Sequence, residues 1–412
     1  MEKWIKIASC MKHIYLITYN GLALQYGVGT YIQQMIKCIK GNNMLLTLIN
    51  FSNNVTTFKI SQDHELRTIE LPLLYSLHGE NRHIRYMKYA FYFLTYYISN
   101  NETNIFHFNF VLHKKLANLL KAKYSDSHII LTVHYLSWLK DLNGNISKLQ
   151  SILERSEEYN SLLEQDISNK YYESTDFLNC ADKIICLSKY TQFMLSNSLK
   201  INPEKIEVVY NGLEEKQSHP TYKDIIELRN KYYFSTSEKI ILFVGRLDKA
   251  KGIEYLIEAF RIVLQSIPDS RLVIVGDGNY NLYFHNSEDI WSKITLTGKI
   301  SKEKLYKLYQ LADIGTIPSL CEQCCYTAIE MMMFGLPFIG TSSTGLKEML
   351  DNHPNDIVML KEEEEFFFPV DELAKKIITR LLQKKSKDKS MYHDRYSLKQ
   401  MKNKILQLYY NL

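Results

Sequence analysis

The chain has 412 residues, more than one hydrophobic core usually supports, so two domains of about 200 residues each are expected. Its composition, 46% apolar and 23% charged, is that of a globular protein and excludes a largely disordered chain. The net charge of +5, from 50 basic and 45 acidic residues without a long basic block, argues against a nucleic acid partner, but it suits an anionic small molecule or a membrane surface.

Short apolar runs alternate with helical patterns along the whole chain, which is typical of parallel sheets covered by helices. The sequence therefore predicts the α/β class with two doubly wound domains. The break is expected after Asn211-Gly212, which gives domains of residues 1–212 and 213–396, with a charged helical insertion at 140–173. Strands are predicted at 13–18, 44–50, 105–108, 129–133, 183–187, 206–209, 239–244, 271–275, 294–297, 314–317, 337–340 and 357–360.

The first candidate ligand contact is the loop from Tyr26 to Tyr31, between the first predicted strand and a helix. Gly27 and Gly29 in this loop let backbone amides approach a phosphate or a sugar closely. Ordinary turn chemistry explains the same pair, and the third glycine of the dinucleotide-binding pattern is absent. Both interpretations stay open.

A predicted helical stretch at 82–97 combines basic and aromatic residues, among them Arg82, Arg85 and Lys88. A helix of this kind either lies on an anionic bilayer, where it would meet a lipid-linked acceptor, or packs its apolar residues into the core. The sequence leaves both alternatives open.

Two histidines end buried strands of the first domain. His107 ends the strand at 105–108, and His134 follows the strand at 129–133. A histidine in such a run is often a core residue with satisfied hydrogen bonds, but both positions lie at the edge where parallel sheets bind ligands. We expect His134 to be the better placed of the two for contact with a ligand.

In the second domain, Arg246 and Lys251 follow the strand at 239–244. Two fixed cations at this sheet edge would neutralise a diphosphate and stabilise it as a leaving group. The alternative is a solvated pair near a turn. The next strand ends in Gly276-Asp277, which provides either structural support or a nucleotide contact.

Two carboxylates follow the strand at 314–317. Glu322 lies in the loop, and Glu330 comes eight residues later, about two helical turns away, so both side chains are expected to face the same ligand. Glu330 stands between Ile329 and Met331, where a carboxylate is costly without a partner. A ribose with two hydroxyls would be a suitable one.

The cysteines predict neither disulfides nor a metal site. There are seven, and the cluster Cys321, Cys324 and Cys325 lacks a second pair at ligand spacing, so small side chains at a crowded helix start explain it. Because the sequence shows no signal peptide and no run of 18 apolar residues, we expect a cytoplasmic protein, at the inner face if it contacts a membrane.

Taken in chain order, these motifs resemble the GT-B retaining glycosyltransferases of glycosyltransferase family 4. The resemblance spans nearly the whole chain, and the set of motifs in this order is more specific than any single motif. It consists of Gly27-Val28-Gly29, Thr132-Val133-His134, Ala181-Asp182 to Leu187-Ser188, Val209-Tyr210-Asn211-Gly212, Gly245-Arg246 with Lys251-Gly252, Val275-Gly276-Asp277-Gly278, and Glu322 with Glu330.

The resemblance implies two Rossmann-like domains facing a central cleft, with the last helix, 397–412, crossing back onto the first domain. Arg246 and Lys251 would bind the diphosphate of a nucleotide-sugar donor, and Glu330 would hold its ribose. Glu322 and His134 would contact the transferring sugar. Members typically use no metal and no cofactor. The remaining residues implied at the donor are Gly27, Gly29, Gly276, Asp277, Gln323, Cys324, Cys325 and Tyr326.

One segment departs from the family pattern. Members usually have Glu-Gly-Phe-Gly-Leu where this chain has Glu322-Gln323-Cys324-Cys325-Tyr326, so Gln323 and Cys325 replace two glycines that admit the donor. Donor base and sugar therefore stay open. The segment also resembles a bacterial subgroup linked to peptide modification, so the acceptor is a glycan, a lipid-linked molecule or a peptide.

Two other functions remain on the same fold. One is a nucleotide-sugar epimerase, and the other is a non-catalytic nucleotide-sugar-binding partner of another transferase. The joint presence of Arg246, Lys251, Glu322, Glu330 and His134 argues against loss of catalysis.

Overall fold

The computed structural model describes residues 11–20, 26–52, 55–72, 80–155, 159, 161–216, 221–285, 287–362, 366–383 and 388–412. The chain divides into two compact units. The first comprises Met1–Trp138, Asn160–Gly212 and Met401–Leu412, and the second comprises Leu139–Tyr159 and Leu213–Gln400.

The first unit is built on an eight-stranded sheet with the order β3-β4-β2-β1-β5-β6-β7-β8. All neighbours are parallel except β3 and β4, which pair antiparallel. β1 is buried on both faces, and residues Ile14 to Ile17 are fully inaccessible to solvent. The strands are β1 (Lys12–Asn20), β2 (Met44–Ser52), β3 (Lys59–Asp63), β4 (Leu66–Pro72), β5 (Thr103–Phe108), β6 (His128–Val133), β7 (Lys183–Cys186) and β8 (Ile206–Val208).

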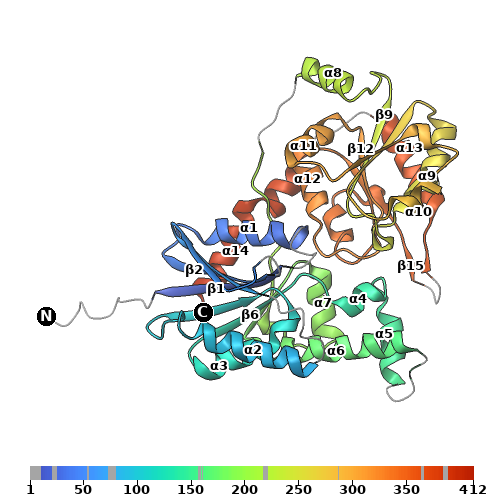
Figure 1. Ribbon diagram of the computed structural model, residues 1–412. Coiled ribbons are helices and arrows are strands. Elements are labelled where there is room, and N and C mark those ends of the chain that lie inside the picture. The colour runs from blue at the N-terminus through green and yellow to red at the C-terminus, as the bar shows by residue number, and fades with distance from the viewer. Residues whose placement is uncertain are drawn as a thin grey trace. The chain divides into compact units, whose positions relative to one another are not determined.

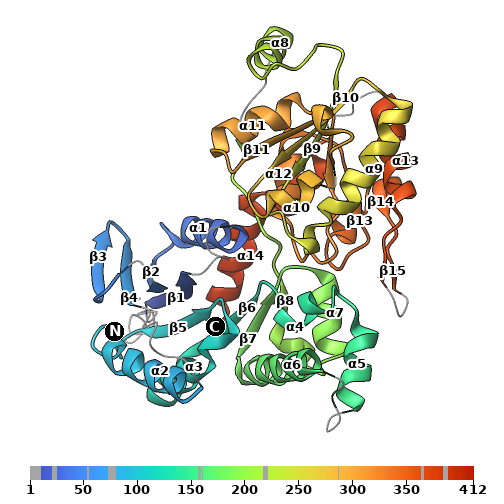
Figure 2. The ribbon, with the colours of Figure 1, turned by 45° about the vertical axis from the view of Figure 1, so that its right-hand side comes forward.

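Helices cover both faces of this sheet. α1 and α14 lie on one face and α2 and α3 on the other (Figures 1 and 2). The last helix is fastened by Lys12, whose Nζ donates to the carbonyls of Tyr409 and Tyr410, both at 2.9 Å. The helices are α1 (Gly27–Ile39), α2 (Glu80–Leu94), α3 (Lys114–Lys123), α6 (Leu162–Cys180), α7 (Lys189–Asn197) and α14 (Leu398–Tyr410), and α4 (Ser137–Asp141) crosses into the second unit at Leu139.

The second unit has a six-stranded parallel sheet with the order β11-β10-β9-β12-β13-β14. Its strands are β9 (Lys239–Val244), β10 (Ser270–Val275), β11 (Ile294–Gly298), β12 (Ile314–Ile317), β13 (Phe338–Thr341) and β14 (Ile357–Val358), with a short hairpin of β15 (Lys361–Glu362) and β16 (Phe366–Phe367). Its helices are α5 (Ile146–Glu154), α8 (Tyr222–Lys231), α9 (Ile253–Ser266), α10 (Tyr280–His285), α11 (Lys302–Leu311), α12 (Tyr326–Phe334) and α13 (Val370–Leu382).

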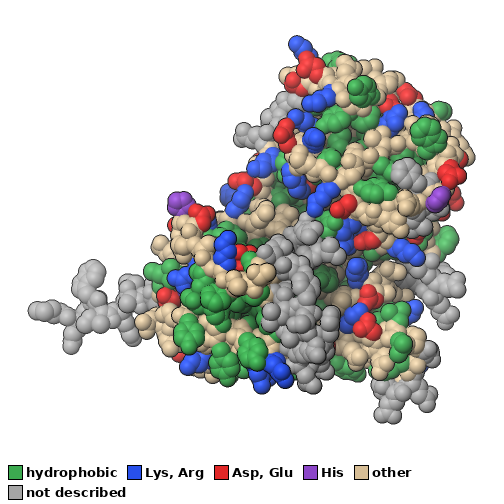
Figure 3. Space-filling view, in the orientation of Figure 1, with side chains coloured by type: hydrophobic (Ala, Val, Ile, Leu, Met, Phe, Trp, Pro, Cys, Tyr) green, Lys and Arg blue, Asp and Glu red, His purple; other side chains and the backbone are tan. Residues whose placement is uncertain are grey.

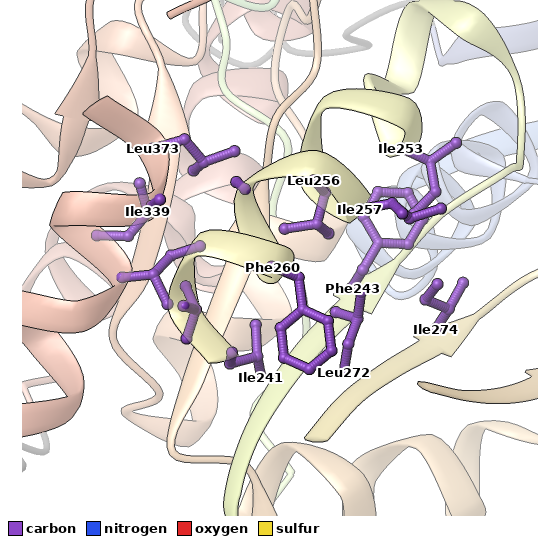
Figure 4. Packing of buried hydrophobic residues seen from close by; sticks show 14 of the residues in the cluster. Ile241, Phe243, Ile253, Leu256, Ile257, Phe260, Leu272, Ile274, Ile339 and Leu373 are labelled. Carbon is purple, nitrogen blue, oxygen red and sulfur yellow. The ribbon is translucent and has the colours of Figure 1, made fainter. Parts of the chain in front are cut away.

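The core of the second unit lies between its sheet and the helices α9 and α13. Phe243 of β9 points toward Ile257 and Ile253 of α9, and Leu373 of α13 belongs to the same cluster (Figure 4). α11 and α12 cover the opposite face of the sheet (Figure 1). This packing leaves the strand ends as the places where polar side chains gather.

Every strand expected from the sequence is present, with ends shifted by at most two residues. Two strands of the first sheet were missed. All five residues of β3 are exposed, so it carries no apolar run, and β4 buries only Ile69 and Leu71. Within the part of the chain that the structure describes, no helix is long and apolar enough to cross a bilayer.

Candidate active site

The strand order of the second unit places its topological switch between β9 and β12, because the chain continues on opposite sides of β9. Open α/β sheets bind ligands at the carboxyl ends of the strands at such a point. Arg246 follows β9, and Glu322 follows β12. Thr327, at the start of α12, donates from Oγ1 to the carbonyl of Val244 at 3.3 Å, which ties this helix to the end of β9.

Two glycines allow the loops at this edge to touch. Gly276 has φ 147°, and a Cβ there would lie 1.7 Å from the carbonyl oxygen of Gly245. Gly252 has φ 66°, and its Cβ would lie 2.0 Å from the carbonyl oxygen of Pro318. The backbone of Asp277 continues the contact, since its carbonyl accepts from the Leu247 amide at 2.8 Å. The observed role of Gly276 and Asp277 is thus to hold the β9 and β10 loops together.

Lys251 and Glu322, predicted separately, form an ion pair between Nζ and Oε1. Their side chains are 21% and 13% exposed. Burial lowers the pKa of Lys251, but the Glu322 carboxylate opposes this and the net shift of the pKa is upward, so the lysine stays protonated at neutral pH. The Glu322 backbone is fixed by Thr344, whose hydroxyl accepts from the Glu322 amide at 2.9 Å.

Arg246 lies on the same side of the unit and is one-third exposed. Its Nη2 pairs with Asp248 Oδ2 at 2.8 Å. Its positive charge lowers the pKa of Lys251, whereas Glu322 raises it. The two cations are therefore close enough to interact electrostatically. The loop after β9 therefore presents a pair of positive charges.

Glu330 is buried on α12, with 2% of the residue exposed. Tyr309 of α11 donates to its Oε2 at 2.8 Å, and Lys302, the first residue of α11, pairs with Oε1. These two donors compensate the carboxylate that the sequence places among apolar neighbours. Sequence reasoning missed Lys302 and Tyr309, because no spacing rule connects α11 with α12.

The segment that replaces the family glycines is packed tightly. Gln323 and Cys324 are buried, Cys325 and Tyr326 are half-buried, and Cys325 precedes the first residue of α12. Burial, with the charge of Glu322, raises the pKa of Cys325 to about 12 and that of Cys321 to about 11. Both thiols are protonated at neutral pH. Among the described residues, no group of three His, Cys, Asp or Glu side chains could hold a metal ion.

In the first unit, His134 follows β6 at the same edge of its sheet as Asn109, which follows β5. His134 Nε2 lies 2.9 Å from Asn109 Oδ1, and the ring of Tyr31 meets the histidine ring edge-on, with centroids 4.5 Å apart. Burial lowers the pKa of His134 to about 3, so the imidazole is neutral at physiological pH. Asn109 was not predicted, although it stands one residue after a predicted strand.

His107 is a core residue. It is fully buried, its Nδ1 lies 2.6 Å from the Tyr409 hydroxyl, and its Nε2 lies 2.6 Å from Thr132 Oγ1. Both ring nitrogens therefore have partners within the first unit. The sequence left open whether His107 is a core residue with satisfied hydrogen bonds or a ligand contact, and the structure shows the core residue.

The sequence predicted a loop at Gly27 and Gly29, and this prediction is wrong because both residues are helical. α1 begins at Gly27, and Thr30 donates its amide to the Tyr26 carbonyl at 3.2 Å, so both glycines lie in the first turn of the helix. The buried face of Val28, Tyr31 and Met35 extends the helical period back to the start of α1. The amides near Gly27 and Gly29 are therefore those of a helix N-terminus.

The structure brings the predicted residues together in two sets. Arg246, Lys251, Glu322 and Glu330 belong to the second unit, with Gly276, Asp277 and the segment from Gln323 to Tyr326. His134 belongs to the first unit, with Gly27 and Gly29.

Two family profiles match the chain, and only residues 218–223 separate the matches. Residues 27–217 match Glycosyltransferase Family 4, and residues 224–394 match Glycosyl transferases group 1. The chain belongs to glycosyltransferase family 4. Its two sheets have the GT-B fold that the sequence predicted.

Similar proteins agree with this assignment. An uncharacterised glycosyltransferase of Methanocaldococcus jannaschii is 32% identical over 180 residues, which are 42% of this chain and 46% of that protein. This family 4 chain spans about half the length of the curated relatives it matches. Sucrose-phosphate synthase from Thermosynechococcus elongatus has the same fold, with a TM-score of 0.72, 18% identity and coverage of 97% and 98% of the two chains. HepE from Anabaena, solved in complex with UDP, also has this fold, with a TM-score of 0.70, 15% identity and coverage of 98% of this chain and 100% of HepE.

Proposed function

We propose that this chain transfers a sugar from a nucleoside-diphosphate sugar to an acceptor. The observation that carries the proposal is the arrangement at the β9–β12 switch of a family 4 chain. Two cations, Arg246 and Lys251, follow β9, and a buried carboxylate, Glu330, lies on the helix that follows β12, so these groups come from the two strands that flank the switch where nucleotides bind in this kind of sheet.

Each of these groups suits one part of the donor. Arg246 and Lys251 would neutralise the diphosphate, and Glu330 would accept hydrogen bonds from the ribose hydroxyls. Lys251 is paired with Glu322, so the diphosphate would compete with the carboxylate for the ammonium group. This competition would free Glu322 to accept a hydrogen bond from a hydroxyl of the donor sugar.

We further propose that transfer retains the anomeric configuration and needs no metal. The acceptor oxygen would bond to the anomeric carbon on the face from which the phosphate departs. The acceptor proton would pass to an oxygen of the departing phosphate. Arg246 and Lys251 would stabilise the negative charge on that phosphate, the role that a divalent cation fills elsewhere. His134, neutral at physiological pH, would hydrogen-bond a hydroxyl of the sugar near the reacting carbon.

A donor screen tests the proposal. Thermal unfolding and calorimetry would be measured with UDP-, GDP-, dTDP- and ADP-sugars, each with magnesium and with EDTA. We expect one nucleotide to raise the unfolding temperature equally in both conditions, because a ligand that binds only the folded state stabilises it. The UDP complex of HepE makes UDP-sugars the first donors to test.

Product analysis then separates the alternatives. Retention would appear as an unchanged anomeric configuration in the NMR spectrum of the product. An epimerase would convert the donor without an acceptor. A non-catalytic protein, which the packed segment at Gln323 and Cys325 would favour, would bind the nucleotide without turnover. Absence of binding to every nucleotide would contradict the transferase proposal.

The acceptor side of the proposal includes contact with an anionic membrane. Tyr89, Tyr92 and Tyr96, along and just beyond α2, are 61%, 64% and 85% exposed. Phe58, which is 54% exposed, packs against Phe93 of α2 with ring centroids 4.4 Å apart and an angle of 50° between the rings. Tyrosine side chains favour the interface between lipid and water, because one end is apolar and the other polar.

The charged side chains that the structure describes on α2 and α3 are basic. The described side chains of α2 and all residues of α3 include no acidic residue, whereas Arg85, Lys88 and Lys123 are exposed. Figure 3 shows hydrophobic side chains interspersed with lysine and arginine along the lower edge, over these helices. The alternative interpretation, in which apolar residues of this helix pack into the core, holds for Tyr86 and Met87, which are buried. The side chain of Arg82, which the sequence singled out, lies outside the described residues.

Sedimentation with lipid vesicles tests this contact. We expect binding to vesicles that contain phosphatidylglycerol but not to pure phosphatidylcholine, and a loss of binding of roughly tenfold in Tyr89→Ser/Tyr92→Ser. Tyr233→Ser is the matched control, because Tyr233 lies in the second unit and is 94% exposed. Equal losses in the two variants, or no binding to any vesicle, would contradict membrane contact.

A further inference from the structure

Among the described residues, Asn109 is the hydrogen-bond partner of the His134 ring, and the side-chain amide of Asn109 is itself held in one orientation. Its side-chain Nδ2 donates to the carbonyl of Ile17 at 3.2 Å, and its backbone amide donates to the same oxygen at 3.1 Å. A carbonyl accepts and never donates, so the side-chain nitrogen must face Ile17. The oxygen Oδ1 must then face His134.

This orientation determines where the histidine carries its proton. Oδ1 can only accept a hydrogen bond, so His134 Nε2, at 2.9 Å from it, must donate. A neutral imidazole has one N–H, which leaves Nδ1 bare and able to accept. His134 is half-buried, and Asn109, with 2% exposure, is shielded from water that could compete for Nε2.

The geometry points to Asn109 as the positioning residue that fixes His134 in its Nε2–H tautomer, so that Nδ1 accepts a hydrogen bond from a hydroxyl of the bound substrate. The inference rests on the proposed function for the role of His134, but the tautomer itself does not. It specifies the direction of the hydrogen bond: Nδ1 of the ring accepts from a substrate hydroxyl and cannot donate to it.

The groups packed around His134 leave this assignment intact. Tyr31 meets the ring edge-on and donates or accepts through its hydroxyl at Thr132, 3.0 Å away, rather than at the histidine. His107 is near enough for the two rings to disfavour each other's positive charge, but burial lowers the pKa of His107 to about 3. No acidic side chain among the described residues contributes to the shift of the His134 pKa.

The experiment replaces Asn109 with aspartate and reads the tautomer by two-bond hydrogen–nitrogen NMR on the ligand-free protein labelled at histidine. We expect the wild-type His134 to show a protonated Nε2 and a bare Nδ1 from pH 5 to 9. In Asn109→Asp, the carboxylate beside Nε2 favours the imidazolium, so Nδ1 becomes protonated as the pH falls. With the donor saturating, kcat of this variant should drop at least tenfold between pH 8 and pH 5, while the wild-type kcat stays flat.

Asn104→Asp is the matched control, since Asn104 lies near the other end of β5, is buried to a similar degree and donates to the Ser99 carbonyl at 2.8 Å, away from His134. It should unfold at a temperature similar to that of Asn109→Asp and keep the wild-type tautomer and pH profile. A wild-type His134 protonated on Nδ1 would overturn the inference whatever the activity. A correct tautomer with no transfer activity would instead count against the proposed function alone.

Discussion

The candidate site of the first unit relies on neutral groups, whereas that of the second unit relies on charges. His134 is an uncharged imidazole that hydrogen-bonds the side-chain amide of Asn109, and the nearby side chains of Tyr31 and Thr132 carry neutral hydroxyl groups. In the second unit, Lys251 faces Glu322, and Lys302 faces Glu330. The contrast fits the proposed transfer, in which the second unit would hold the anionic nucleotide and His134 would accept a hydrogen bond from a hydroxyl group of the substrate.

The largest expected effect separates turnover from donor binding. His134→Ala should lower kcat by about 10²- to 10³-fold, the size found when one hydrogen-bonding group near a reacting centre is removed. The dissociation constant of the nucleotide should change less than twofold, because the contacts to the diphosphate lie in the second unit. Steady-state kinetics and calorimetry measure the two quantities. Full activity in His134→Ala would remove the first unit from the chemistry.

Loss of a cation in the second unit should have the opposite signature. Lys251→Ala should weaken nucleotide binding by about 30-fold, since a hydrogen bond to a charged group contributes about 2 kcal/mol. It would also leave Glu322 without its ion-pair partner beside the diphosphate. Lys249→Ala is the control, because Lys249 is exposed and two residues away. Equal binding by the two variants, measured by calorimetry, would contradict the role of Lys251.

Acid should destabilise the neutral first unit through its buried histidines. Burial lowers the pKa of His107 and of His113 to about 3, from 6.5. The unfolded chain therefore binds more protons below pH 6.5, so this part of the stability is complete above pH 6.5 and is lost as the pH falls toward 3. By pH 5 the loss is about 2 kcal/mol for each histidine, which thermal unfolding at pH 7 and pH 5 would detect.

The two histidines also provide a matched pair. His113 stacks on Phe51, and neither of its ring nitrogens has a hydrogen-bond partner in the described part of the chain, so His113→Leu should reduce the acid sensitivity at little cost at pH 7. His107→Leu should destabilise the protein by about 1–3 kcal/mol already at pH 7, because the buried Tyr409 hydroxyl loses its partner and Thr132 keeps only its hydrogen bond to Tyr31. Identical pH profiles for wild type and His113→Leu would show that His113 is not buried as a neutral ring.

The smallest effect concerns the cysteines beside the charged site. Because the pKa of Cys325 is raised to about 12 and that of Cys321 to about 11, iodoacetamide at pH 7.5 should leave both largely unmodified while it labels the exposed Cys180. Peptide mass spectrometry over a time course would measure the rates. Rapid labelling of Cys325 would show a reactive thiolate and reopen a chemical role for the cluster.

The sequence predicted the second unit better than the first. The strands of both sheets are buried apolar runs, so their positions follow from hydrophobicity alone, and only the exposed β3 and the half-exposed β4 escaped. Lys251 and Glu322 could be named because each follows a strand of the same sheet. Their pairing could not, because it depends on which strands are neighbours.

The missed residues share one property: each acts through a partner on another element. Lys302 and Tyr309 reach Glu330 from the preceding helix, and Asn109 reaches His134 from the neighbouring strand. The early turn of α1 at Gly27 and Gly29 was missed for a different reason, since a glycine pair after a strand suggests a loop unless the buried face of the helix is known to extend that far.

Besides the excursion of Leu139–Tyr159, the chain passes from the first unit to the second at Gly212–Leu213 and back at Gln400–Met401, and Leu213 and Ser397 next to these passages form a parallel bridge. Leu213 donates its amide to the Tyr396 carbonyl at 3.0 Å and accepts from the Leu398 amide at 2.7 Å. A protease that cuts at Gly212–Leu213 therefore leaves two fragments, and the second still carries α14, whose carbonyls at Tyr409 and Tyr410 accept from Lys12 of the first. Nicked protein should still migrate as a single particle in its native state and separate into two fragments only after denaturation.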